Sequence, residues 1–174
     1  MQKIIIISVL IVSVFSFSFF MPQEEGVKWI SVNEVDALYA KEPRPILIDV
    51  YTSWCGWCKV MDKKTYTNEK LATYINTHFY AVKLDAETNE KLIFNNKTYS
   101  FDAAARSNSF AVYLLGGQMS FPTTVLLASP DSGPAPMAGY LKPEEMEAPL
   151  KYFGEKVYAA KSYNDFSKEL KKEW

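Results

Sequence analysis

Cysteine and histidine, the usual ligands of structural zinc, are scarce in this sequence. Its 174 residues include two cysteines and a single histidine. A closed structural zinc site needs four ligands, usually drawn from cysteine and histidine, and a second closely spaced cysteine pair is absent. A zinc domain and a fold held by several disulfides are therefore both disfavoured. We expect His78 to complement the end of a helix dipole rather than to bind a metal.

An excess of charge of either sign is also missing. The chain carries 19 Lys and Arg residues against 20 Asp and Glu residues, a formal net charge of -1. Nucleic-acid-binding domains usually present a basic face, so we expect no nucleic-acid partner. There is no internal repeat and no low-complexity tract, and the length suits one domain with a sizeable core.

Long apolar runs are rare, and the main one lies at the N-terminus. Lys3 is followed by residues 4–20, which contain no charge and are rich in Ile, Val and Phe. This pattern is typical of a secretory signal peptide, and the small residues of Ser16-Phe17-Ser18 suit cleavage near Ser18. The run is barely long enough to span a bilayer, so a retained anchor is the alternative. We expect residues 1–20 to be a signal peptide or membrane anchor and the protein to be exported.

The two cysteines lie together in the stretch Trp54-Cys55-Gly56-Trp57-Cys58-Lys59. Two thiols separated by two residues form a compact redox device, because one sulfur can attack a disulfide while the other resolves the intermediate. Zinc sites use the same spacing, but this chain lacks the remaining ligands. A purely structural disulfide is the other alternative. A single closely spaced pair favours chemistry over stabilisation.

The rest of the chain alternates between strand-like and helix-like segments. Residues 46–51 (ILIDVY) form a near-continuous apolar run, as expected of a central strand covered on both faces. Further strands are expected over 80–85 and 125–128, with shorter ones near 27–30 and 137–140. Helices are expected after Ser31 or Asn33, from the cysteine pair, after Thr67 or Asn68, from Pro143 to about Tyr158, and over 164–174.

Residues 87–120 are less regular. Segments 92–94 and 98–101 flank a plausible hairpin turn at Asn95-Asn96-Lys97. A short helix capped by Asn108 or Ser109 is expected to run to Leu115 and to end at the glycines 116–117.

The order of these elements, ILIDVY running into WCGWCK, and FPTT before a strand resemble the thioredoxin superfamily over about residues 27–158. The chain is most similar to exported bacterial thioredoxin-like proteins. The resemblance implies an α/β thioredoxin-like fold, with a central mixed β-sheet flanked by helices. It also implies an insertion at about 87–120 before the cis-proline strand, leaving a helical extension over 159–174 and a periplasmic location.

Four residues match the family pattern. Cys55 and Cys58 match the active-site pair, and Asp49, six residues before Cys55, matches a buried strand carboxylate. Pro122 matches the cis-proline that faces the cysteines. Lys83 is a weaker match to a lysine near the buried carboxylate. Two features depart from thioredoxin itself: Trp57 replaces a proline, and the segment from Lys83 to Pro122 is longer, which leaves partner choice open.

Each catalytic candidate has an expected role. Cys55 begins a helix, where free N–H groups and the dipole favour the thiolate, so we expect it to be the more exposed sulfur and to attack the substrate. Cys58, one turn along the same face, resolves the mixed disulfide. We expect Asp49 to accept the proton of Cys58, because a buried carboxylate has a raised pKa and needs a partner. The alternative is a strand-end Asp that reaches solvent or a backbone amide.

Aromatic residues are expected to surround the cysteines. A cis bond at Pro122 would expose the backbone of Phe121 to an extended substrate segment, and Trp54, Trp57 and Phe121 would form an apolar landing patch. Packing in the core is the alternative, chiefly for Trp54. The candidate substrate-binding residues are Trp54, Gly56, Trp57, Phe121 and Thr123.

The sequence thus predicts a thiol-disulfide oxidoreductase of exported proteins. We expect a monomeric disulfide reductase with no cofactor or metal, which acts on protein thiols and disulfides and is recharged by a membrane electron donor. The N-terminal segment, if it is not cleaved, would provide its only membrane contact. Oxidase or isomerase activity is the first alternative, and a non-catalytic binding module of the same fold is the second.

Overall fold

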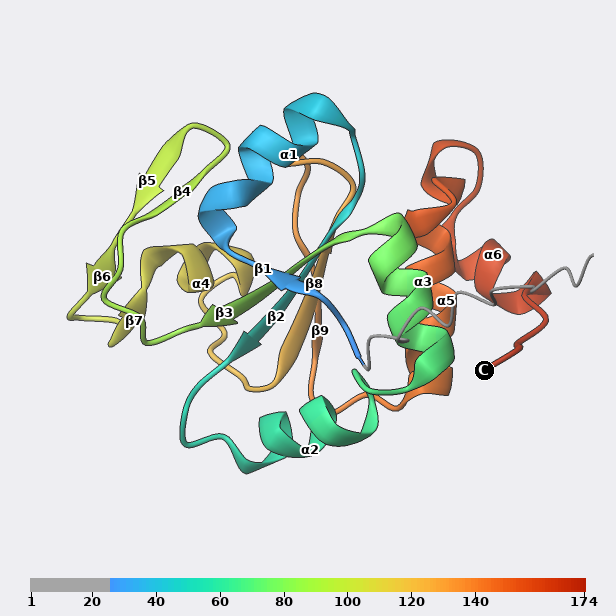
Figure 1. The fold of residues 1–174 in the computed structure, drawn as a ribbon, viewed down its shortest axis with the longest axis horizontal. Helices are drawn as coiled ribbons and strands as arrows, with labels where there is room; N and C mark the ends of the chain where they lie inside the picture. Colours follow the sequence, from blue (N-terminus) through green and yellow to red (C-terminus); the bar gives the residue numbers. More distant parts are fainter. Residues whose placement is uncertain (1–25) are drawn as a thin grey trace, which may run out of the picture.

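A five-stranded mixed sheet forms the centre of the computed structural model, which describes residues 26–174 (Figure 1). The strand order is β1 (Trp29–Ile30), β3 (Tyr80–Asp85), β2 (Ile46–Tyr51), β8 (Thr123–Leu127) and β9 (Ala135–Ala138). The first three strands are parallel, whereas β8 and β9 run antiparallel to their neighbours. The expected α/β fold with a central mixed sheet is confirmed.

The predicted signal peptide or anchor, residues 1–20, lies outside the described residues. Within residues 26–174, no helix has the length and apolar character needed to cross a membrane.

β2 occupies the middle of the sheet, as its sequence predicts. Side chains alternate between the two faces of a strand, so Ile46, Ile48 and Val50 join one core cluster while Leu47 joins the other. Asp49 is in phase with Leu47 and therefore points to that second face. All five of these residues are buried, because helices cover both faces of the strand.

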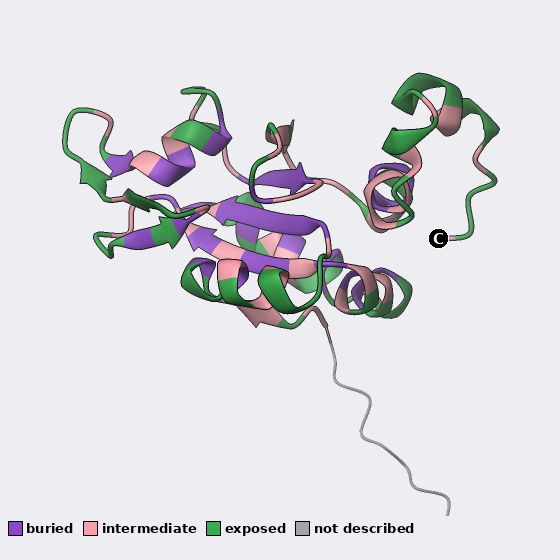
Figure 2. Cartoon of the chain, turned by 90° about the horizontal axis from the view of Figure 1, so that it is seen from above, coloured by how far each residue is buried: buried purple, intermediate pink, exposed green. Residues whose placement is uncertain are grey.

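Helices cover the two faces of the sheet, and Figure 2 shows buried strands between helices that keep an exposed side. The face with Ile46 packs against the short 3-10 helix η1 (Val32–Glu34), α1 (Val35–Lys41) and α4 (Ser109–Leu114). The face with Leu47 packs against α2 (Gly56–Lys64), α3 (Glu69–His78) and α5 (Pro143–Gly154). The redox pair belongs to this second side, because α2 carries Cys58.

Side-chain caps begin several helices where the sequence predicted them. Ser31 forms a capping box with Glu34 at η1, and Asn68 accepts a hydrogen bond from the N–H of Leu71 at the start of α3. Asn108 does the same for Phe110 at the start of α4. Each such cap contributes about 1 kcal/mol to stability.

The insertion forms small strands beside α1 and α4, at the left in Figure 1. The predicted hairpin is present as β4 (Leu92–Phe94) and β5 (Lys97–Tyr99), followed by the paired strands β6 (Phe101–Asp102) and β7 (Ser107–Asn108). Its turn contains two residues rather than three: Asn95 and Asn96 adopt φ of 50° and 57°, which suits a type I′ turn and places Lys97 in the strand.

Several element boundaries differ from the prediction. β8 begins at Thr123 because β2 continues to pair with it there, and β9 ends two residues earlier than expected, at Ala138. α5 ends at Gly154 rather than near Tyr158: Lys156 has a φ of 56°, which interrupts the helix before the 3-10 turn η2 (Val157–Ala159). The terminal helix α6 (Tyr163–Glu169) is likewise shorter, because the backbone of Leu170 is extended.

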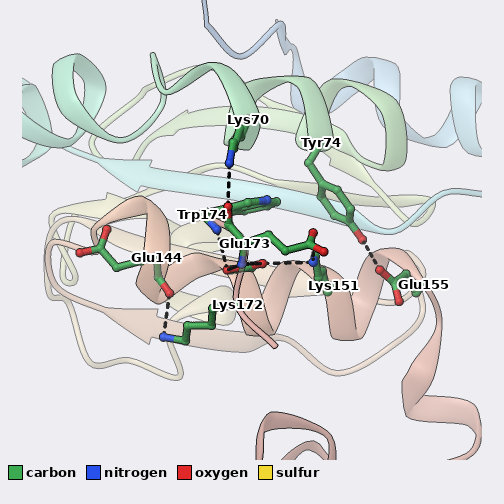
Figure 3. A network of polar contacts seen from close by, with 9 residues as sticks. Lys70, Tyr74, Glu144, Lys151, Glu155, Lys172, Glu173 and Trp174 are labelled. Atoms are coloured by element: carbon green, nitrogen blue, oxygen red, sulfur yellow. Dashed lines mark hydrogen bonds and ion pairs between the residues drawn. The ribbon is translucent and has the colours of Figure 1, made fainter. Parts of the chain in front are cut away.

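The residues after α6 return to α3 and α5 (Figure 3). The buried carboxylate of Glu147 accepts hydrogen bonds from the N–H groups of Glu173, at 2.7 Å, and of Trp174, at 3.1 Å. Lys151 forms ion pairs with both Glu147 and Glu173, and the Lys70 ammonium donates to the carbonyl of Glu173 at 2.7 Å. These contacts hold the terminal segment against the side of the sheet that also carries α2.

Candidate active site

The cysteine pair stands at the junction of β2 and α2. The strand ends at Tyr51, a short turn follows in which the N–H of Cys55 donates to the carbonyl of Thr52 at 3.2 Å, and α2 begins at Gly56. Cys55 is the N-cap of α2, and its sulfur accepts a hydrogen bond from the N–H of Cys58 at 3.1 Å. The helix therefore presents N–H groups to the sulfur that is expected to react as a thiolate.

Cys55 and Cys58 are joined by a disulfide bond. The expected difference in exposure is small, since Cys55 is 5% exposed and Cys58 is 3% exposed. The sulfur of Cys55 is turned inward, toward the first turn of α2 and its partner, which accounts for the near equality. As whole residues, both cysteines are buried, and Cys55 is the more exposed by a narrow margin only.

Asp49 belongs to the central strand β2, and its side chain is buried. Its side chain is 2% exposed, and its Oδ2 lies 3.3 Å from the ammonium of Lys83 on the adjacent strand β3. Burial raises the pKa of Asp49 to about 6, although the charge of Lys83 opposes the shift and Asp62 adds to it. The reading of Asp49 as a solvent-reaching strand-end residue is therefore excluded by its position.

Lys83 connects Asp49 to a wider cluster. Its ammonium also forms an ion pair with Asp62 of α2 and lies over the rings of Trp29 and Tyr51, at 5.1 and 5.2 Å from their centroids. The buried hydroxyl of Tyr66 lies 3.0 Å from the Thr124 hydroxyl, and burial raises the pKa of Tyr66 well above its ordinary value. Tyr66 therefore stays protonated near neutral pH.

Aromatic side chains form an exposed rim near the cysteines. Trp54 is 66% exposed and Trp57 is 63% exposed, so the alternative that Trp54 packs in the core is wrong. The rings of Trp54 and Phe121 meet edge to face at 5.9 Å, and those of Trp57 and Tyr140 lie 5.6 Å apart. We call these four residues the aromatic rim.

The other candidate substrate-binding residues differ in how exposed they are. Phe121 is partly buried and packs against the core cluster that contains Ile46. The Phe121–Pro122 peptide bond is cis, as the resemblance implied. Gly56 is exposed, with open space where a Cβ would stand. Thr123 is buried, however, and its hydroxyl donates to the carbonyl of Ser120 at 2.8 Å, so its side chain is not presented to a substrate.

Sequence reasoning missed four residues of this region: Asp62, Tyr66, Glu87 and Tyr140. The position of Asp62, four residues after Cys58 on one helix, could have indicated a shared face. The Trp54 indole N–H donates to Glu87 at 3.0 Å, a contact with no local signal because the two residues are far apart in the sequence. Within the described residues, no cluster of three or more His, Cys, Asp or Glu side chains could hold a metal ion.

Solved structures similar to this chain share its fold. A thioredoxin-fold protein from Helicobacter pylori covers 72% of this chain and 79% of its own, with a TM-score of 0.55 and 19% identity. A structure described as DsbH oxidoreductase covers 75% and 85%, with a TM-score of 0.53 and 17% identity. At these identities the likeness concerns the fold.

The sequence relative described next is much longer than this chain. Uncharacterized protein B0495.5 of Caenorhabditis elegans is 31% identical over 102 residues, which make up 59% of this chain and 12% of that protein. The chain thus spans about an eighth of that relative's length. The family model Thioredox_DsbH, described as a protein of unknown function, DUF255, matches residues 15–172. With the cysteine pair, the sheet order and a match over most of its length, the chain belongs to this DsbH-like family of the thioredoxin superfamily.

Proposed function

We propose that this protein is a thiol-disulfide oxidoreductase that reduces disulfides of exported proteins. The observation that carries the proposal is the cysteine pair at the N-terminus of α2, bridged in the oxidised form and accompanied by the buried carboxylate of Asp49. Its membership of a thioredoxin-like family supports the same chemistry.

The reaction begins with the reduced pair. The thiolate of Cys55 attacks one sulfur of a substrate disulfide, and the other substrate sulfur leaves as a thiolate that takes up a proton from water. Cys55 is now joined to the substrate in a mixed disulfide. The amide groups at the start of α2 stabilise the attacking thiolate, because they lie at the positive end of the helix dipole.

Resolution uses Cys58 and Asp49. The S–H bond of Cys58 breaks, its proton moves to the carboxylate of Asp49, and the electron pair stays on sulfur. This thiolate attacks the sulfur of Cys55, the Cys55–Cys58 disulfide forms, and the bond from Cys55 to the substrate breaks. The second substrate sulfur leaves as a thiolate that takes up a proton from water. Two electrons have then passed from the pair to the substrate, and Asp49 returns its proton to solvent. An external dithiol, which we propose to be a membrane-bound donor, reduces the pair again.

Substrate contact is assigned to the aromatic rim. Among the described residues, the backbone N–H and C=O of Phe121 make no hydrogen bond, so an extended segment of substrate could pair with them. The exposed indole rings offer apolar surface to an unfolded or flexible chain. We further propose export through residues 1–20, supported by Lys3 and the uncharged run that follows it.

The order of attack is tested by trapping. Cys58→Ser removes the resolving thiol, so it should accumulate mixed disulfides through Cys55, whereas Cys55→Ser should accumulate almost none. Mass spectrometry of adducts formed with a disulfide-containing protein substrate measures trapping by the two variants. Equal trapping by the two variants would reject the assignment of Cys55 as nucleophile.

The direction of electron flow is tested by the reduction potential of the pair, measured in glutathione or dithiothreitol buffers. A value near that of thioredoxin, about -270 mV, supports a reductase. A value near -120 mV, roughly that of a strong thiol oxidant, would reject the reductase in favour of the oxidase alternative.

A further inference from the structure

Lys83 is shared between two carboxylates that come from different elements. Its ammonium lies 3.3 Å from Asp49 of β2 and forms an ion pair with Asp62 of α2. Asp62 follows Cys58 by four residues, one turn along the same face of α2. One ammonium therefore pairs with two carboxylates, and one of these belongs to the helix that carries Cys58.

The exposure of the three charged side chains increases from Asp49 through Lys83 to Asp62. The side chains of Asp49, Lys83 and Asp62 are 2%, 24% and 38% exposed, respectively. Charges interact more strongly where water is excluded, so the balance around Asp49 depends on how Lys83 divides its contacts. The rings of Trp29 and Tyr51 limit where the Lys83 ammonium can lie.

Other groups also face Asp49 from the surrounding elements. Tyr51 comes from the end of β2 and Tyr66 from the turn after α2, while Asp85 at the end of β3 acts on Tyr51. Burial is the main influence that raises the pKa of Asp49, Lys83 lowers it, and Asp62 raises it. Asp62 is thus the one other carboxylate that acts on Asp49 among these described groups.

We propose that Asp62 is a positioning residue of the redox reaction: it draws Lys83 away from exclusive pairing with Asp49 and so keeps the buried carboxylate a good acceptor for the proton of Cys58. This inference rests on the proposed function. Without Asp62, Lys83 would pair with Asp49 alone and stabilise its charged form. The S–H bond of Cys58 would then break less readily, because the O–H bond formed on Asp49 would be weaker.

The direct test is the titration of the Asp49 carboxyl carbon by NMR in the oxidised protein, which requires no turnover. Asp62→Asn should lower the midpoint by about 0.5 to 1 pH unit, because a neighbouring negative charge is removed. Asp62→Glu keeps the charge and should stay near the wild-type midpoint. Glu90→Gln removes an exposed carboxylate that makes no polar side-chain contact within residues 26–174, and it is the matched control.

The kinetic readout is the rate of mixed-disulfide resolution as a function of pH. Asp62→Asn should slow it roughly threefold at neutral pH and move the acidic limb of the profile to lower pH, since a weaker base is deprotonated earlier. Asp62→Glu should restore both. Asp62→Ser removes the same charge and replaces Asp62→Asn if that variant loses its native near-UV circular dichroism.

The outcomes separate the two proposals. An active wild type whose Asp49 midpoint is unmoved by Asp62→Asn, or is moved equally by Glu90→Gln, overturns the role of Asp62 alone. A shifted midpoint with an unchanged rate profile overturns it as well. A wild type that exchanges no disulfide overturns the proposed function, and the inference with it.

Discussion

The buried carboxylate of Asp49 costs the folded protein stability, and the proposed reaction would use it as a proton acceptor. Its pKa of about 6 in the folded protein lies above the ordinary value of 3.8, chiefly because burial disfavours the charged form. A shift of about 2 units corresponds to roughly 3 kcal/mol between the two protonation states. The folded protein therefore contains a carboxylate that would be more stable in water, which is the expected state of a group that must accept a proton.

Asp49→Asn should stabilise the oxidised protein at pH 7.5 and have little effect near pH 4. Folded Asp49 binds its proton near pH 6 and unfolded Asp49 near pH 3.8, so the stability associated with the neutral form is present at low pH and lost as pH rises through 6. Asn does not titrate, so we expect a gain on the order of 2 kcal/mol at pH 7.5. Urea denaturation at both pH values measures it. A gain of the same size at pH 4 would show that titration is not the cause.

The turn of the insertion hairpin is held by the carboxylate of one residue of α1. Asp36 of α1 accepts hydrogen bonds from the N–H groups of Asn95 and Asn96, at 3.0 and 3.1 Å. Asn33 adds a second contact by accepting from the N–H of Ile93 at 2.6 Å. Leu92 and Phe94 are buried in the core beneath. The hairpin thus packs on its own domain, and its turn is held by the side chain of Asp36.

Asp36→Ala should loosen this turn without altering the redox pair. Removing an acceptor of two backbone hydrogen bonds costs about 1 to 3 kcal/mol, and the amides of Asn95 and Asn96 should exchange with deuterium faster. Asp36→Asn keeps one acceptor oxygen and should show a smaller change. Unchanged exchange in both variants would mean that the hairpin does not depend on Asp36, and a changed reduction potential would mean that it is coupled to the active site.

At the scale of the whole molecule, the aromatic rim is assembled from separate parts of the chain. Trp54 precedes α2, Trp57 lies within α2, Phe121 precedes β8, and Tyr140 follows β9. Phe121 packs partly against the core, whereas the two indole rings are largely exposed. Replacing Trp57 should therefore cost little stability, whereas replacing Phe121 should cost more.

Trp57→Ala should slow reaction with a protein or peptide disulfide by about tenfold, an effect of roughly 1.4 kcal/mol. Reaction with hydroxyethyl disulfide should change little, because so small a molecule cannot span the rim. The melting temperature should fall by a few degrees at most, since an exposed side chain contributes little to the core. Phe121→Ala should lower it more. Equal rate losses on both substrates, with a large loss of stability for Trp57→Ala, would show that Trp57 is structural.

The sequence by itself determined the features that depend on neighbouring residues. The apolar run of β2 and the caps at Ser31, Asn68 and Asn108 act within a few residues, so strands and helix starts could be predicted from them. The spacing of Cys55 and Cys58 determined their redox interpretation in the same way. Predictions of strand and helix ends were weaker, because pairing with β2 decides where β8 begins and the left-handed backbone at Lys156 follows the end of α5.

Only the tertiary structure decided how the site is tuned. Asp49, Asp62 and Lys83 come from β2, α2 and β3, and no local pattern indicates that one ammonium serves both carboxylates. The burial of Thr123 likewise follows from its contact with Ser120 and its place in the sheet. Burial and shared charge are properties of groups that folding brings together, and these properties set the proton affinity on which the proposed chemistry depends.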